Sequence, residues 1–308
     1  MRFPRQLKNI WEVQADSLGI YSSDAAASRV AEWLQTCEET HGRCQQDVAI
    51  PELPTRILEI QGPERVRLLV TEHNQRDLYA CLSHCWGDLS MIRTTQVTCA
   101  DFQVNVPWSD LPLTFRHAID LAQRLGLTYL WIDSLCIMQD DADDWRHEGS
   151  KLASIYADAY ITIAAVASHN AFQGLYRPNQ SRFLTNCELR RNASSTLRKL
   201  HVGQKKDEIP RKSSVLPLFR RAWFHQERIL SRRIVLFGII KLYWECRVTR
   251  RCECEHMSDA SQMNTPQFPS SGTASNTQRW YNLVEFHSSL SLTFEKDIFS
   301  SLQGIATM

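Results

Sequence analysis

Apolar residues in the middle of the chain occur as short runs that alternate with helical stripes. The runs have the length of buried strands and lie at residues 79–83, 128–133 and 160–165. Residues 113–125 and 142–157 instead place apolar side chains at the spacing of one helix face. Strands that alternate with helices of this length are typical of a parallel, right-handed sheet. The sequence therefore predicts an α/β domain built around a parallel sheet.

Segments on both sides of this core carry further patterns. Residues 23–41 are expected to form a helix that ends at Gly42. The polar and basic stretch at 173–214 has no clear period and is expected to be an insertion with partial order. The remaining expected elements are a hairpin or edge strands at 56–60 and 66–71, a helix at 216–231, a hairpin at 234–237 and 239–244, and two helices within 280–303.

The composition excludes several classes of partner. Lys and Arg number 35 and Asp and Glu number 34, which leaves a net charge of +1 at pH 7. Such a balance gives no field that favours nucleic acid or an anionic membrane. No apolar run approaches the about 20 residues of a membrane span, and none has the form of a signal peptide. We therefore expect a soluble, cytoplasmic protein with reduced cysteines that binds neither nucleic acid nor membrane.

The helix expected at 142–157 places a carboxylate on its apolar side. At about 100° per residue, the stripe that contains Trp145 also contains Glu148. A buried acid is either paired or chemically useful. Two interpretations of Glu148 therefore stay open: a catalytic carboxylate, or an internal ion pair with an arginine such as Arg221 or Arg228.

Other acidic positions also have two interpretations. Asp140 and its acidic neighbours up to Asp144 are interpreted as a cap for this helix rather than a Mg²⁺ site. Asp133 ends a buried strand and is either an anchor for the following loop or an active-site acid. Glu227 lies on the apolar side of the helix expected at 216–231, where it is a structural hydrogen-bond partner or a second active-site acid.

Cysteine and histidine residues gather at the end of the first expected helix. Cys37, His41 and Cys44 are spaced by four and three residues, which could offer three ligands to Zn²⁺. The residues that could complete such a site are Cys246, Cys252, Cys254 and His256. Paired Cys-x-x-Cys knuckles are missing, so buried thiols without a metal are the favoured interpretation.

Four blocks of the chain together resemble the fungal heterokaryon incompatibility (HET) domain. Their order and spacing fit, and flanking residues on both sides agree, so the resemblance covers nearly the whole chain. The blocks are Tyr79 to Gly87; Leu111 to Thr114 with Trp131 to Ile137, Gln139 and Asp140; Asp144 and Trp145 with Glu148 and Tyr156; and Arg221 to Trp223 with Gln226 to Arg228, Leu230 and Ser231. This resemblance implies a cytosolic protein of filamentous fungi that acts in non-self recognition and triggers cell death when incompatible cells fuse.

HET domains look distantly similar to Toll/interleukin-1 receptor (TIR) domains, some of which cleave NAD at its nicotinamide bond with a glutamate on a helix. The resemblance implies a flavodoxin/TIR-like core with helical flanks, no firm cofactor, and NAD as a candidate substrate. Glu148 stands at the matching catalytic position. The positions that would bind the substrate are Ser83, His84, Trp86, Gly87, Asp133, Gln139, Asp140, Trp145 and Glu227.

The resemblance also suggests how the chain is organised. We expect an N-terminal helical segment at 1–55, a HET-type α/β domain at 56–250 with its motif core at 79–231, a linker at 251–276 and a C-terminal helical segment at 277–308. Because family members usually continue further, this last segment is expected to be truncated. Two functions remain open: NAD hydrolysis, or a non-catalytic module that self-associates or recruits protein partners in the same signalling.

Overall fold

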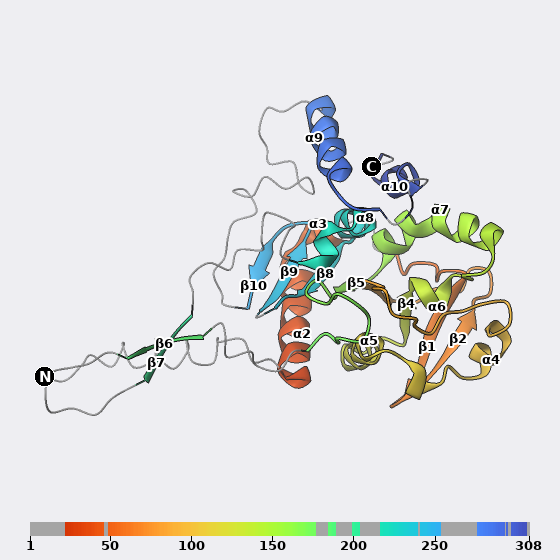
Figure 1. Cartoon of the computed structure of the whole chain (residues 1–308), viewed down its shortest axis with the longest axis horizontal. Helices are drawn as coiled ribbons and strands as arrows, with labels where there is room; N and C mark the ends of the chain where they lie inside the picture. Colours follow the sequence, from red (N-terminus) through yellow and green to blue (C-terminus); the bar gives the residue numbers. More distant parts are fainter. Residues whose placement is uncertain are drawn as a thin grey trace, which may run out of the picture.

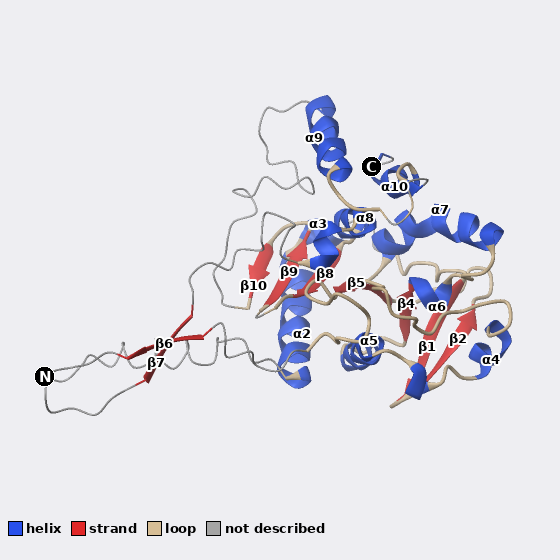
Figure 2. Cartoon of the chain, viewed as in Figure 1, coloured by secondary structure: helices blue, strands red, loops and turns tan. Residues whose placement is uncertain are grey.

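The computed structural model describes residues 22–45, 49–176, 184–188, 199–203, 216–239, 241–253, 276–292, 294 and 297–306. Within these ranges an eight-stranded mixed sheet has the strand order β10-β9-β8-β5-β3-β4-β1-β2. Helices lie against both faces of this sheet (Figure 1 and Figure 2). The predicted combination of a central sheet with covering helices is therefore confirmed, but the sheet is mixed rather than wholly parallel.

Four strands in the middle of the sheet run parallel. β3 pairs with β4 on one side and with β5 on the other, and β5 pairs with β8. Their bounds are β3 (Tyr79–Ser83), β4 (Tyr129–Ile132), β5 (Ile161–Ala164) and β8 (Arg233–Phe237). Every residue of these strands is buried, because helices cover both faces. This explains why they are nearly continuous apolar runs in the sequence.

Antiparallel strands extend the sheet on both sides. β1 pairs with β4 and β2 with β1, whereas β9 pairs with β8 and β10 with β9. Their bounds are β1 (Arg56–Gly62), β2 (Arg65–Val70), β9 (Leu242–Cys246) and β10 (Arg250–Cys252). Both predicted hairpins are confirmed, and β10 was not predicted. Among the described strands, the parallel arrangement thus holds for the central four. The short connections between β1 and β2, β8 and β9, and β9 and β10 can join only antiparallel neighbours. The antiparallel pairing of β1 with β4 instead joins strands that are far apart in the sequence.

The helices divide between the two faces of the sheet. Tyr79 Oη and Cys81 Sγ both donate to the carbonyl oxygen of Ile155 in α7 (Ala142–Asp158), at 2.8 and 3.7 Å. Because side chains alternate along a strand, Ser83 must point to the same face, which α7 shares with α8 (Ala222–Leu230). Helices α2 (Ser23–Thr40) and α5 (Leu113–Arg124) lie on the other face (Figure 1).

One predicted helix is interrupted. The stretch expected to be a single helix at 216–231 forms a 3-10 turn, η3 (Pro217–Arg220), and then α8, with Arg221 extended between them. The backbone of this junction is held by Ser291, whose nitrogen donates to Arg220 O at 2.7 Å and whose carbonyl oxygen accepts from Ala222 N at 3.0 Å. Periodicity in the sequence cannot show this distant partner.

The remaining described elements are short or peripheral. They are α3 (Gly42–Gln45), α4 (Cys99–Val104), η1 (Trp108–Asp110), α6 (Asp133–Cys136), the antiparallel pair β6 (Leu184–Glu188) and β7 (Lys199–Gly203), α9 (Asn276–Ser288) and α10 (Ser300–Ala306). Most of the expected linker, and residues 1–21 of the expected N-terminal segment, lie outside the described residues. Among the described helices, none has the length and apolar character needed to cross a bilayer.

Candidate functional site

A serine and a glutamate meet at the carboxyl end of the central strand β3. Ser83 is the last residue of β3, and its hydroxyl donates a hydrogen bond to Glu227 Oε2 in α8. The serine is buried, whereas Glu227 is partly exposed. Open α/β sheets bind ligands at the carboxyl ends of their parallel strands. The pair therefore lies where a ligand site is expected.

The surroundings of Glu227 bring its protonation into the physiological range. Burial raises the pKa of Glu227 to about 7, although Arg221 and the hydroxyls of Ser83 and Tyr156 act to lower it. The negative charge of Asp133 adds to the increase. Near neutral pH, Glu227 can therefore both hold and release a proton, as a general acid or base must.

Asp133 links the loops that follow the two neighbouring strands β3 and β4. Its Oδ2 accepts from Trp86 Nε1 at 2.8 Å, and its Oδ1 accepts from the backbone nitrogen of Ser134 at 2.8 Å. The Asp133 side chain is 28 % exposed. Asp133 is thus a loop anchor, and it also leaves a carboxylate at the solvent-facing edge near Glu227.

His84 lies beside this carboxylate, with its Nδ1 3.8 Å from Asp133 Oδ1. Its ring is buried and packs edge-on against Phe115 of α5, with ring centroids 4.9 Å apart. Burial lowers the pKa of His84 to about 4, Arg221 acts in the same direction, and Asp133 opposes them. The backbone of His84 also belongs to the site, because its carbonyl oxygen accepts a hydrogen bond from Arg221 Nη1.

Gly87 allows the loop after β3 to approach the loop after β5. Its φ is +71°, and a Cβ built on it would lie 2.5 Å from Asn170 Cβ. We expect Gly87→Ala to lower the free energy of unfolding by about 2 to 4 kcal/mol, because left-handed strain and overpacking add. Urea denaturation measures this loss.

Gly126 provides a matched control for this prediction. It also has a positive φ, +78°, but nothing lies within 4 Å of an added Cβ. Gly126→Ala should therefore lose only the backbone contribution, about 1 to 2 kcal/mol. If both variants lost the same free energy of unfolding, the close approach of Asn170 to Gly87 would not disfavour a side chain at that position.

Glu148 points inward, as the helical pattern predicted, but its neighbours are basic. Its side chain is 1 % exposed, and Oε1 lies 3.4 Å from Lys151 Nζ and 3.7 Å from His147 Nε2. Arg56 is also close enough for a favourable charge interaction. Of the two arginines considered from the sequence, Arg228 instead binds Glu245. Oε2 of Glu148 has no hydrogen-bond partner among the described residues.

The other predicted site residues mostly organise loops. Gln139 Nε2 donates to the carbonyl oxygens of Asp133 and Ile137, at 3.0 and 2.9 Å, and Asp140 Oδ1 accepts from Gln96 N at 2.9 Å. Trp145 packs edge-on against a tryptophan of α8, Trp223, with centroids 6.4 Å apart. The acidic neighbour Asp141 caps α7 through the backbone nitrogens at 143 and 144, which confirms the capping interpretation.

Two members of the site were not predicted as such. Tyr156 comes from α7, and the hydrogen bond of its hydroxyl to Glu227 helps to hold down the pKa of that carboxyl. Arg221 lies at the break between η3 and α8 and acts on Glu227 electrostatically. Tyr156 shares the inward stripe of its helix, so its direction was visible in the sequence. Arg221 was considered in the sequence only as a partner of Glu148 and as part of a HET block. Its place beside Glu227 depends on the break between η3 and α8, which is tertiary.

A separate cluster could hold a metal. Cys37, His41, Cys44 and Cys246 place their ligand atoms within 4.8 Å of one another. The three residues that were spaced for zinc in the sequence are therefore brought together, and Cys246 is the fourth member.

Part of the chain matches a known protein family. Residues 79–227 match the family model described as heterokaryon incompatibility protein (HET). The match begins at the first residue of β3 and ends at Glu227, so it spans both partners of the Ser83–Glu227 hydrogen bond. Comparisons with curated proteins and with solved structures gave no match.

Proposed function

We propose that the chain acts in the cytoplasm in heterokaryon incompatibility, the non-self recognition of filamentous fungi, and that Glu227 is the centre of an active site that hydrolyses NAD. The HET match supports the biological role. The parallel strands support the TIR-like part of the proposal. Numbered along the chain, β3, β4, β5 and β8 lie in the order 2-1-3-4, which is the beginning of the flavodoxin-like order.

The observation that carries the proposal is the environment of Glu227. A carboxylate with a pKa of about 7, hydrogen-bonded to Ser83, lies at the carboxyl edge of β3 beside its two parallel neighbours. In flavodoxin-like sheets this is the switch point at which ligands bind. Titratable groups with strongly shifted pKa values at such places are candidates for catalysis.

Hydrolysis of NAD requires little more than one placed carboxylate. The bond between ribose C1′ and the nicotinamide nitrogen breaks, and nicotinamide leaves with the electron pair. Ionised Glu227 stabilises the oxocarbenium character that develops on the ribose. Water then forms the new bond to C1′ and loses its proton to solvent. The cationic nicotinamide ring is a good leaving group without protonation.

Neighbouring side chains suit the rest of the substrate. Trp86 is partly exposed, and its hydrogen bond to Asp133 fixes the orientation of the indole, which can stack on a cationic ring. Arg221 is partly exposed and carries a planar guanidinium, which suits the oxygens of a diphosphate.

Glu227 is a better candidate than Glu148 for the reacting carboxylate. The Glu148 side chain is enclosed and lies beside Lys151 and Arg56, a setting that suits the internal ion-pair interpretation. Its catalytic role stays a prediction from the TIR resemblance. We therefore propose that Glu148 anchors α7 and that Glu227 acts on the substrate.

The test measures nicotinamide released from NAD by purified protein. Wild type should release nicotinamide, and Glu227→Gln should lower the rate at least about tenfold. Glu285→Gln, an exposed residue of α9, is the control for the loss of one carboxylate. If only Glu148→Gln abolished release, the catalytic role would belong to Glu148. No release from folded wild type would refute the enzymatic proposal.

A second candidate function is a self-associating scaffold in the same signalling. Aromatic side chains on and after α9 face solvent: Trp280 is 39 % exposed, Tyr281 63 % and Phe299 82 %. Such side chains are enriched in protein interfaces. If light scattering shows an oligomer that Tyr281→Ser converts to monomers, and NAD is not cleaved, the scaffold is the function.

A further inference from the structure

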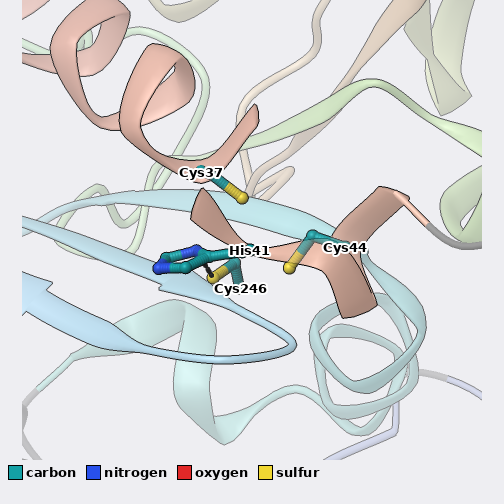
Figure 3. Close-up of side chains that lie close together, drawn as sticks. All are labelled: Cys37, His41, Cys44 and Cys246. Atoms are coloured by element: carbon teal, nitrogen blue, oxygen red, sulfur yellow. Dashed lines mark hydrogen bonds between the residues drawn. The ribbon is translucent and has the colours of Figure 1, made fainter. Parts of the chain in front are cut away.

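Four side chains from three elements gather where α2 ends beside β9. Cys37 lies in the last turn of α2, His41 caps that helix, Cys44 lies in α3 and Cys246 ends β9. Their ligand atoms all lie within 4.8 Å of one another, and Cys246 Sγ is 3.3 Å from His41 Nδ1. Figure 3 shows the three thiols and the imidazole ring gathered around one small volume. We propose that they bind a structural zinc ion.

The distances and the donor set both suit tetrahedral zinc. With Zn–S near 2.3 Å and Zn–N near 2.0 to 2.1 Å, the ligand atoms of a tetrahedral site with three sulfurs and one nitrogen lie about 3.5 to 3.8 Å apart. The longest separation, at most 4.8 Å, would need to contract by about 1.0 to 1.3 Å to reach this geometry. Three thiolates and one imidazole are a known structural zinc set and are too soft for magnesium or calcium. Four protein ligands also close the coordination shell, so the ion has a structural role.

Backbone groups that follow Cys246 contact two of the sulfurs. Thr249 N donates to Cys246 Sγ at 3.4 Å. The backbone of Arg247 makes a hydrogen bond to the Cys44 thiol. Hydrogen bonds from outer groups of this kind hold metal ligands in place.

Positive charge surrounds the same sulfurs. The side chain of Arg233 makes a hydrogen bond to the Cys37 thiol, and Arg232 interacts favourably with Cys44. Three thiolates and one Zn²⁺ have a net charge of −1, which nearby guanidinium groups would balance. The Nε atoms of Arg232 and Arg233 are buried and lack a hydrogen-bond partner among the described residues.

The ion would connect parts of the chain that are far apart in sequence. His41 and Cys246 are 205 residues apart. All four ligands lie outside residues 79–227, so the connection encloses the whole HET match. Trp33 of α2 already packs on Trp244 of β9, with centroids 6.2 Å apart. Zinc would lock this contact by closing a long loop, which disfavours the unfolded chain. The inference does not depend on NAD hydrolysis.

The test is the metal content of the protein. The full chain, purified under reducing conditions without an affinity tag, should contain one zinc per chain by mass spectrometry of the elements. Cys44→Ser and Cys246→Ser should each lose most of that zinc. Cys99→Ser is the matched control, because Cys99 is a free thiol of α4 outside the cluster and should retain the zinc.

Measurements on the wild type keep the test decisive if the serine variants fail to fold. A strong zinc chelator should remove the ion and lower the melting temperature, and added Zn²⁺ should restore it. Cobalt in its place should give the visible absorption of a tetrahedral thiolate site. Wild type with no zinc, with iron in place of zinc, or with a disulfide within the cluster would overturn the inference.

Discussion

Glu245→Leu is expected to lower the free energy of unfolding by about 3 to 5 kcal/mol. Glu245 is buried in β9, and Arg228 binds it through two hydrogen bonds of 2.8 and 2.6 Å. Arg250 Nε lies 3.4 Å from the same carboxylate. Burial acts to raise the pKa of Glu245, but the two arginines outweigh it, and the pKa is lowered. The substitution leaves both guanidinium groups without their carboxylate. Urea denaturation at pH 7 measures the loss.

The pair Glu59–Arg67 is the matched control for that prediction. It joins β1 to β2 at 2.5 Å, but its side chains are 20 % and 38 % exposed. Ion pairs that reach solvent contribute little, so Glu59→Leu should cost no more than about 1 kcal/mol. A comparable loss in both variants would mean that burial does not determine the strength of the Glu245 network.

Glu227→Gln is expected to make the protein more stable at pH 8 by up to about 3 kcal/mol. The folded pKa of Glu227 is about 7, against a reference value of 4.5, a difference of about 2.5 units. At 1.36 kcal/mol per unit, ionising this carboxyl in the folded protein costs about 3 kcal/mol. The amide carries no such cost. The effect is measured as the difference between the two unfolding free energies as a function of pH.

The pH range over which the two unfolding free energies diverge identifies Glu227 as the source of the difference. A raised pKa means that the protonated carboxyl supports the fold fully below pH 4.5 and that this support is lost as pH rises through about 7. Wild type and variant should therefore agree at pH 4.5 and diverge up to pH 8. His84, with a lowered pKa of about 4, contributes equally to both and cancels. Glu285→Gln, the exposed control, should show no divergence, and a constant offset in Glu227→Gln would contradict the assignment.

The position of Glu227 on its helix could be predicted from the sequence, but its hydrogen-bond partner could not. Its inward direction followed from helical periodicity, and so did that of Glu148. Periodicity gives the face of a helix but not its partner. Ser83 is 144 residues from Glu227, and only the docking of α8 on β3 joins them. By contrast, Glu148 meets Lys151 one turn away and Arg56 at the start of β1. The two acids looked alike in sequence, and their neighbours distinguish them.

The cysteine–histidine cluster also combines residues that the sequence groups with one that only the fold adds. Cys37, His41 and Cys44 are close in sequence, so their grouping at a helix end followed from spacing alone. Several distant residues could have completed the set, and sequence offered no means of choosing among them. Pairing of β9 with β8 brings Cys246 to the end of α2, and this decides the fourth position.

By itself, the sequence determined the local structure of this protein. The apolar runs of β3, β4 and β5, the stripes of α5 and α7 and the cap at Asp141 depend on residues within one or two turns of each other. Tertiary structure alone decided the strand order, the break at Arg221, the partner of Glu227 and the fourth residue of the cysteine–histidine cluster. These features arise from contacts between residues far apart in the chain, which periodicity and local propensity do not encode.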